Sequence, residues 1–296
     1  PTPALTLHTS AKADDFLARM QPLLEAREAA YGLMLGVAAA VASDPQRYGE
    51  HAPYFATVED EAGEDKSGIA AAAAMTPPYG VILYSERPDP QPGLEAIAQD
   101  LIAHNWPVFG VNAREPLCAE FAAIWARLTG TRATAAMRER VFELRQVIHP
   151  SYSPGRMRHA TPDDLDLVTE WTLAFAAEAL SGVEQTNPEA TRRNTARKIA
   201  EQVLYLWDDG GPVSLAGVAR PTAHGISIGP VYTPPERRGR GYASSLVAAP
   251  SQGMLDEGRA FVTLFTHLAN PTSNHIYQAI GYRPVCDYTL YRFEPI

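Results

Sequence analysis

The sequence predicts a mixed α/β protein built from two similar halves in tandem. Short β-rich runs such as 203–207 and 261–266 alternate with helical patterns, which is typical of sheets covered by helices. The same order of elements occurs twice at a spacing of about 150 residues, a period that fits a domain rather than a solenoid unit. Residues 150–155 are rich in turn formers, as linkers are. We therefore expect one domain over residues 1–150 and another over 155–296.

Each half is expected to contain a strand, one or two helices, an antiparallel meander, and then helix, strand, helix and strand. Both begin with a short strand, a Ser or Thr cap, an acidic first turn and an amphipathic helix, from Leu5 and from Met157. The next strands are expected at 53–58, 69–75, 81–84 and 108–113, with counterparts at 203–207, 213–218, 226–232 and 261–266. The result is a mixed, mostly antiparallel sheet flanked by helices.

A glycine-rich turn between a strand and a helix is the main functional signal. Residues 231–246 run from an apolar strand through Pro234-Pro235 into a turn with Gly239 and Gly241, and then into a helix. The free N–H groups of such a helix N-terminus, beside glycines that let a ligand come close, bind phosphate. A Walker loop is excluded because no Gly-Lys-Ser/Thr follows, and a dinucleotide fingerprint because the third glycine is missing.

The spacing Arg238-x-x-Gly241-x-Ala243 resembles the pyrophosphate loop of the GNAT acetyltransferases, Arg/Gln-x-x-Gly-x-Gly/Ala. The resemblance implies acetyl-CoA as cosubstrate and a loop that holds its diphosphate. The residues implied are Arg238, Gly239, Arg240, Gly241, Tyr242, Ala243 and Ser244. The alternative is a surface turn with scattered arginines.

The strand before this turn is expected to carry a bulge at Gly229-Pro230, because proline cannot donate to a sheet ladder. In GNAT proteins the corresponding strand holds the pantetheine arm of coenzyme A by backbone hydrogen bonds. The resemblance assigns that role to Val231, Tyr232 and Thr233.

The segment 270–285 also resembles a GNAT block, Asn-x-x-x-Asn-x-x-Tyr-x-x-x-Gly-Tyr/Phe. Asn270 or Thr272 can cap a helix that Gly281 ends. The resemblance makes Tyr277 the acid that protonates the leaving thiolate, with Asn270 and Asn274 on the pantetheine. As alternatives, Tyr277 packs against the helix end, and the asparagines are cap and surface residues. The match covers roughly residues 155–296.

The general base is less certain in the sequence. Glu178 lies in a mostly apolar helix, on one face with Trp171 and Phe175, where a carboxylate is costly to bury without a purpose. The alternatives are a helix-end glutamate that points to water, or an ordered water chain as base. His224, Glu184 and His275 are weaker candidates.

The first half has lost the phosphate loop. It offers residues 86–93, with three prolines that remove amide donors and acids that repel phosphate, where the second half has 237–241. We therefore expect a degenerate copy that does not bind coenzyme A. An unrelated helical domain is the alternative, and the roles left open for the first half are a homodimer surface, a lid or a scaffold.

Composition narrows the class of protein. A net charge of −9 argues against a general nucleic-acid binder. The cysteines, Cys118 and Cys286, lack metal-type spacing, so we expect no metal and a reduced, cytoplasmic protein. No apolar run reaches membrane length, and we expect no signal peptide.

The function that we expect is transfer of an acetyl group from acetyl-CoA to a primary amine of a small molecule or peptide, by direct attack in a ternary complex. One alternative is a non-catalytic acyl-CoA-binding regulatory module. The other is a nucleic-acid binder that uses the basic cluster 237–240.

Overall fold

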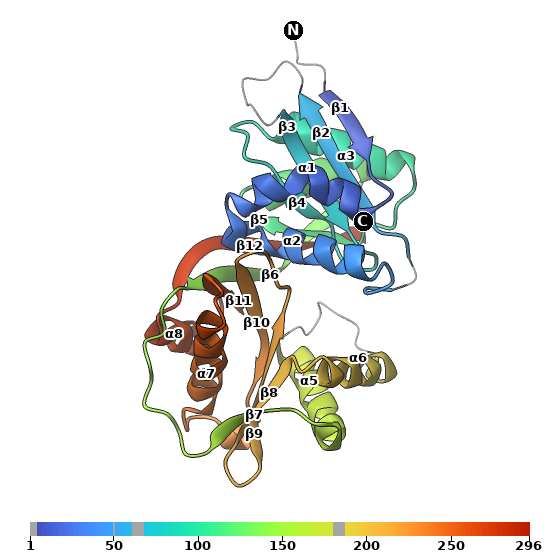
Figure 1. Cartoon of the computed structure of the whole chain (residues 1–296). Helices are drawn as coiled ribbons and strands as arrows, with labels where there is room; N and C mark the ends of the chain where they lie inside the picture. The colour runs from blue at the N-terminus through green and yellow to red at the C-terminus, as the bar shows by residue number, and fades with distance from the viewer. Residues whose placement is uncertain (1–4, 50, 61–67, 180–186) are drawn as a thin grey trace. The chain divides into compact units, whose positions relative to one another are not determined.

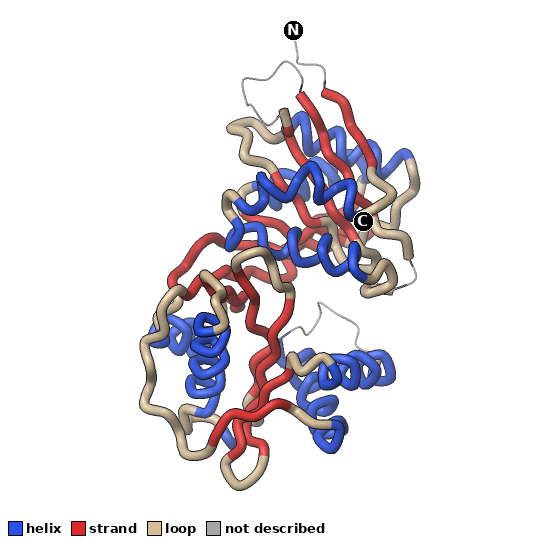
Figure 2. Tube along the Cα trace, in the orientation of Figure 1, coloured by secondary structure: helices blue, strands red, loops and turns tan. Residues whose placement is uncertain are grey.

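The computed structural model describes residues 5–49, 51–60, 68–179 and 187–296 of the chain. Its contacts divide the chain into two compact units. Unit 1 comprises Pro1–Glu139 and Cys286–Ile296, and unit 2 comprises Arg140–Val285. In each unit, helices pack against a sheet (Figure 1, Figure 2). The predicted mixed α/β class, with mostly antiparallel strands and flanking helices, is confirmed.

Unit 1 is built around an antiparallel sheet with the strand order β1-β2-β3-β4. Its strands are β1 (Leu5–Thr9), β2 (Tyr54–Asp60), β3 (Ile69–Met75) and β4 (Ile82–Tyr84), and its helices are α1 (Ala13–Glu25), α2 (Glu28–Ser43), α3 (Gln91–Ala103) and α4 (Leu117–Thr129). One apolar core lies between the sheet and α1 and α2, and a second lies between the sheet and α3 and α4. A parallel bridge between Val81 and Val111 joins β4 to β5 (Gly110–Arg114).

The central strand β3 is buried on both faces, which explains its unbroken apolar sequence. Ala71 and Ala73 belong to one core, and Ala72 and Ala74 to the other. Small side chains here let the helices approach closely. A Cβ placed on Gly93 of α3 would lie only 2.8 Å from the Cβ of Ala71. The Ala-rich strand and Gly93 therefore set the separation between α3 and the sheet.

This close approach predicts opposite effects for two Gly→Ala changes in helices. Gly93→Ala forces two carbons into contact, and we expect it to lower the free energy of unfolding by about 1–2 kcal/mol. Gly253→Ala in α7 is the matched control, because a Cβ there would meet nothing within 4 Å. It should raise the free energy of unfolding by about 0.5–1 kcal/mol. Urea unfolding followed by circular dichroism measures both, and a stabilised Gly93→Ala variant would contradict the packing argument.

Each boundary between the two contact units lies inside a long strand. Strand β6 (Thr131–Leu144) crosses from unit 1 into unit 2, and β12 (Arg283–Pro295) crosses in the opposite direction. In unit 1, β12 pairs antiparallel with β5, with Tyr288 opposite Arg114. In unit 2, β6 neighbours β11. The contact boundaries therefore fall at 139/140 and 285/286 rather than at 150–155, because strand pairing and not chain order assigns these residues.

Unit 2 repeats the order of elements that was expected for the second half. Its strands are β7 (Arg156–His159), β8 (Leu204–Asp208), β9 (Pro212–Ala219), β10 (Gly225–Tyr232) and β11 (Phe261–His267), and its helices are α5 (Leu165–Ala179), α6 (Pro188–Ala200), α7 (Tyr242–Asp256) and α8 (Pro271–Ile280). The strand order is β6-β11-β10-β9-β8-β7, and only the β10–β11 pairing is parallel among the registers from β7 to β11. One core lies under α7 and α8, and another under α5 and α6. Parallel β10 and β11 bring their carboxyl ends to one edge, where α7 begins.

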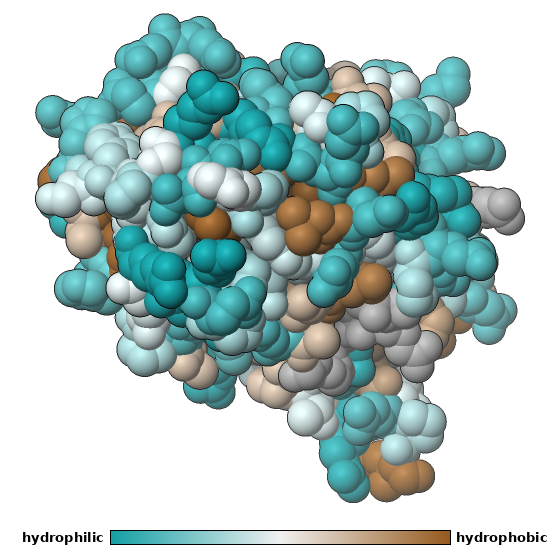
Figure 3. Space-filling model, turned by 90° about the horizontal axis from the view of Figure 1, so that it is seen from below, coloured by the Kyte–Doolittle hydropathy of each residue, from teal (hydrophilic) through white to brown (hydrophobic). Residues whose placement is uncertain are grey.

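The surface seen in Figure 3 is mostly hydrophilic, with apolar residues in small groups. None of the helices in the described part of the chain is long and apolar enough to cross a membrane.

Candidate functional site

The first component of the candidate site is a bulge in β10. The register between β10 and β9 shifts between Ile228 and Val231, and Gly229 has a φ of +152°, which glycine tolerates best. The bulge predicted at Gly229-Pro230 is therefore confirmed. The parallel register with β11 extends from Gly225 to Ile228 and ends there. The edge of β10 beyond the bulge, with Val231, Tyr232 and Thr233, thus separates from β11.

The second component is the turn that starts α7. Gly239 and Gly241 have φ angles of +75° and +78°, a left-handed conformation that side chains rarely adopt. Gly241 occupies the N-cap position and has no side chain with which to cap the helix. The first N–H groups of a helix have no partner inside it, so those of Tyr242, Ala243 and Ser244 face the turn. The predicted glycine turn and helix start are confirmed.

A segment far away in the sequence supports this turn. Ser153 Oγ donates a hydrogen bond to the carbonyl of Arg240 at 2.7 Å, and the Ser153 N–H donates to Ser245 Oγ at 2.9 Å. Ser245 is fully buried. The Tyr242 hydroxyl donates to Asp209 Oδ2 at 2.6 Å, and it also interacts with the side chain of Arg240 in the turn. Sequence reasoning missed Ser153 and Ser245, and no local signal marks a contact across 92 residues.

Arg238 and Glu178 lie together beside the bulged strand. Arg238 Nη2 donates to Glu178 Oε2 at 2.6 Å, and its Nε donates to the carbonyl of Thr233 at 2.9 Å. The Tyr232 hydroxyl donates to Glu178 Oε1 at 3.2 Å. Burial and the Glu178 carboxylate raise the pKa of Tyr232. Two predicted cofactor residues and the predicted base thus form one cluster.

The environment of Glu178 differs from the one that was expected. Its side chain is 46% exposed, although it follows Trp171 and Phe175 at helical spacing. The expected cost of burying a carboxylate does not arise, because α5 ends one residue later and the side chain reaches Arg238. Its accessible carboxylate is therefore held by polar partners rather than by an apolar pocket.

Tyr277 lies on α8 with its side chain in the apolar core of unit 2. It is 8% exposed, and its ring meets that of Tyr282 edge-on, with 6.1 Å between centroids. Burial raises the pKa of Tyr277 to about 12, while a hydrogen bond with the Ser273 side chain acts in the opposite direction. The phenol therefore keeps its proton at neutral pH.

Both asparagines shape the turn between β11 and α8. Asn270 Oδ1 accepts the N–H of Ser273 at 3.1 Å, which confirms the predicted N-cap. Gly281 ends the helix with a φ of +112°, also as predicted. Asn274 Nδ2 donates to the carbonyls of His267, Leu268 and Asn270 at 3.3, 3.4 and 2.9 Å. Its Oδ1 is buried and accepts no hydrogen bond from the part of the chain that is described.

Comparison with known proteins supports this geometry. Residues 215–291 match a family model described as FR47-like protein. The structure is similar to a GCN5-related N-acetyltransferase from Sphaerobacter thermophilus, with a TM-score of 0.62, 17% identity, and coverage of 97% of this chain and 95% of that chain. A GNAT-family acetyltransferase from Colwellia psychrerythraea gives a TM-score of 0.58 at 13% identity, over 98% of this chain and 99% of the other. This protein has the GNAT fold.

A tandem GNAT protein from the clavulanic acid biosynthesis pathway is similar along its whole length as well. Its TM-score is 0.58 at 12% identity, and 97% of this chain and 98% of that chain are covered. A search of curated protein sequences found no match. The resemblance found in the sequence is thus confirmed at the level of the fold, over both units of the chain.

Of the remaining candidates, the structure describes His224 and His275 but not Glu184. His224 lies between β9 and β10, where its carbonyl accepts the N–H of Ala260 at 2.8 Å. His275 is exposed on α8, and Glu184 lies outside the described residues. Among the residues that are described, no three His, Cys, Asp or Glu side chains group together as metal ligands would.

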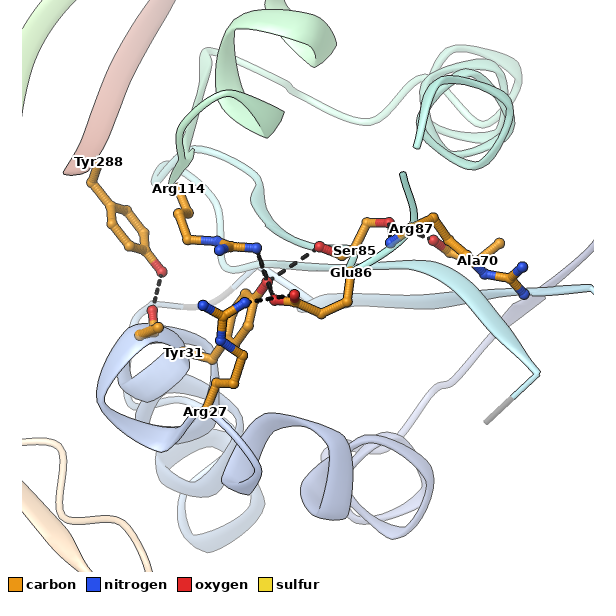
Figure 4. Close-up of polar contacts among 9 residues, drawn as sticks. Arg27, Tyr31, Ala70, Ser85, Glu86, Arg87, Arg114 and Tyr288 are labelled. Atoms are coloured by element: carbon orange, nitrogen blue, oxygen red, sulfur yellow. Dashed lines mark hydrogen bonds and ion pairs between the residues drawn. The ribbon is translucent and has the colours of Figure 1, made fainter. Parts of the chain in front are cut away.

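In unit 1, an ionic cluster lies just after β4 and at the end of β5 (Figure 4). Glu86, just after β4, accepts from Tyr31 Oη at 2.5 Å and from Arg114 Nη2 at 2.8 Å through Oε1. Its Oε2 accepts from Arg27 Nη1 at 2.7 Å. Arg114 Nη2 also donates to Tyr31 Oη at 2.8 Å. Side chains at or near α2 and β5 thus donate three hydrogen bonds to the Glu86 carboxylate.

The helix that follows this cluster is also unlike α7 at its N-terminus. Asp89 Oδ1 accepts the N–H of Gln91 at 3.3 Å, and Pro92 has no N–H to offer. A carboxylate and a proline thus stand where α7 has glycine and free amides. This arrangement is unfavourable for a phosphate.

Proposed function

We propose that the protein is an acetyl-CoA-dependent N-acyltransferase whose site lies in unit 2, within the domain expected over residues 155–296. The observation that carries the proposal is the uncapped N-terminus of α7, directly after a strand that separates from β11 at a bulge. The uncapped helix start suits a diphosphate. The separated strand leaves backbone groups free to bind the pantetheine arm of coenzyme A.

The residues of the turn fit coenzyme A. A Cβ on Gly239 would meet nothing within 4 Å, so the backbone there is open to a ligand. The arginines of the turn add positive charge beside the amides of α7. We assign the diphosphate to Arg238, Gly239, Arg240, Gly241, Tyr242, Ala243 and Ser244, and the pantetheine arm to Val231, Tyr232, Thr233, Asn270 and Asn274.

The chemistry assigned to this site is acyl transfer, for which acetyl-CoA supplies an activated thioester. We assign to the backbone N–H groups of Val231 to Thr233 the role of holding a carbonyl oxygen, because these residues follow the bulge in β10. Tyr277 has a protonated phenol at neutral pH and is our candidate for the group that gives a proton to the leaving sulfur. Glu178 is our candidate to take the proton from a primary amine, because its carboxylate is accessible. The amine belongs to a small molecule or a peptide.

One set of contacts favours a second candidate, a non-catalytic module that binds acyl-CoA. Tyr277 packs in the core and Glu178 is paired with Arg238, as they would be if neither had a chemical role. This alternative retains the diphosphate site and lacks transfer. The two functions therefore differ in turnover and not in cofactor affinity.

Two measurements test the function together. Calorimetry with acetyl-CoA should show one site for each chain, and thiol release should rise when primary amines and peptides with free amino groups are supplied. Binding without thiol release from any amine in the panel would favour the non-catalytic module. Absence of binding would refute both.

For unit 1 we propose a degenerate GNAT-like copy that does not bind coenzyme A. The Glu86 cluster and the Asp89 cap support this proposal, because Glu86 already occupies the donors of the cluster and an aspartate accepts an N–H of the next helix. The calorimetric stoichiometry checks it, since two sites for each chain would contradict it.

A further inference from the structure

We propose that Glu178 competes with the diphosphate of coenzyme A for Arg238, so that cofactor binding releases Glu178. The inference rests on the function proposed above and adds a regulation of the same site. In the cofactor-free protein the carboxylate is tied to the pyrophosphate loop. In the complex it is free to act on an amine, which makes its availability depend on a bound cofactor.

Arg238 donates hydrogen bonds through two of its guanidinium nitrogens in its present position. Its Nη2 donates to Glu178 Oε2 at 2.6 Å and its Nε to the Thr233 carbonyl at 2.9 Å. Its guanidinium carbon lies 5.8 Å from the centre of the Tyr232 ring. The side chain therefore lies along β10, toward α5. A diphosphate at α7 would compete with Glu178 for the Nη2 of Arg238.

The pair is weak enough to be displaced. Arg238 and Glu178 are 48% and 46% exposed, and ion pairs with that exposure are screened by water and salt. A diphosphate carries more negative charge than one carboxylate and also receives the amides of α7. The Tyr232 hydroxyl remains as a partner that can hold Glu178 near the strand after Arg238 leaves.

The glutamate of the unit 1 cluster is held by more charged partners than Glu178 is in unit 2. There Glu86 is bound by Arg27, Arg114 and Tyr31 together, and the Arg114 side chain is only 19% exposed (Figure 4). An incoming anion would have to displace Glu86 from donors on three side chains at once. In unit 2 a single arginine holds the glutamate from the loop side, so one exchange of partner is sufficient.

Glu178→Gln tests the competition by calorimetry with coenzyme A. Glutamine keeps the size of the side chain and can still accept from Tyr232, but it removes the charge. We expect the dissociation constant for coenzyme A to fall by about two- to fivefold at low ionic strength, with the difference disappearing at about 0.5 M salt. The affinity for pantetheine, which has no diphosphate, should not change.

Two further variants separate the proposed pair from simple charge effects. Glu236→Gln removes an acid of the same turn that is not bonded to Arg238 in the described structure, although its charge acts on Tyr232. A similar gain in affinity for this variant would overturn the proposal. In an Arg238→Ala background, Glu178→Gln should have no effect on coenzyme A binding, and a gain that persists would likewise overturn it.

The remaining outcomes are also decisive. Weaker coenzyme A binding by Glu178→Gln would show that Glu178 orients Arg238 for the diphosphate, and the competition would be rejected while the proposed function stands. An unchanged affinity would reject it in the same way. If neither the wild type nor Glu178→Gln binds coenzyme A, the proposed function falls and the competition falls with it.

Discussion

Gly241→Glu should abolish coenzyme A binding. Gly241 has a φ of +78°, and a Cβ on it would lie 2.9 Å from Ser153 Oγ, which donates to the neighbouring Arg240 carbonyl. Any side chain therefore strains the turn, and a carboxylate adds negative charge where the diphosphate is expected. We expect calorimetry to show no binding at ligand concentrations about 100 times the wild-type dissociation constant, a loss of about 2.7 kcal/mol or more.

Gly258→Glu is the matched control for this change. Gly258 follows the other end of α7 and has a φ of +96°, and a Cβ on it would meet nothing within 4 Å. The variant therefore carries the same charge and a similar backbone strain away from the turn. It should bind coenzyme A as the wild type does. Unchanged binding by Gly241→Glu would refute the assignment of the loop.

Tyr277→Phe should lower turnover by about 10²-fold or more and leave the affinity for acetyl-CoA nearly unchanged. Phenylalanine keeps the ring that packs against Tyr282 and loses only the hydroxyl and its hydrogen bond with Ser273. Since the pKa of Tyr277 is about 12, wild-type activity should not fall through loss of this proton between pH 7 and 10. Steady-state kinetics with a primary amine identified by the thiol-release panel measure the effect.

Tyr282→Phe provides the comparison. This tyrosine is fully buried in the same core, and its hydroxyl lies 2.8 Å from Ser251 Oγ. The variant loses one buried hydroxyl, as Tyr277→Phe does, and its free energy of unfolding should fall by about 1 kcal/mol. Its turnover should stay close to that of the wild type. Equal losses of turnover in both variants, or none in Tyr277→Phe, would assign the acid elsewhere.

Much of the candidate site could be predicted because it is local in the chain. Gly229-Pro230 interrupts β10, Gly239 and Gly241 supply left-handed turns, and Asn270 and Gly281 mark the ends of α8. Each of these effects acts over a few residues through backbone sterics or a capping hydrogen bond. A single sequence is sufficient to locate such features, and their order produced the resemblance to GNAT proteins.

The contacts between distant segments could not be predicted in the same way. The alternation in β6 suits a strand, but nothing in it indicates that its end lies beside β11 rather than beside a strand of its own half. Ser153 lies in a segment with the composition of a linker, and only the fold shows that it supports the glycine turn before α7. The partner of a strand edge or a hydroxyl is chosen by three-dimensional packing.

Glu178 shows both what the sequence could predict and what only the tertiary structure could show. The helical period correctly put it on the face of α5 that also carries Trp171 and Phe175, and from there the sequence suggested a buried carboxylate. Its exposure and its bond to Arg238 depend on where α5 ends and on where the loop after β10 passes. Local chemistry in the chain thus determined the elements, the bulge and the glycine turn. Tertiary packing alone decided which unit the last strands join and which charges meet, because those choices depend on pairing across tens to hundreds of residues.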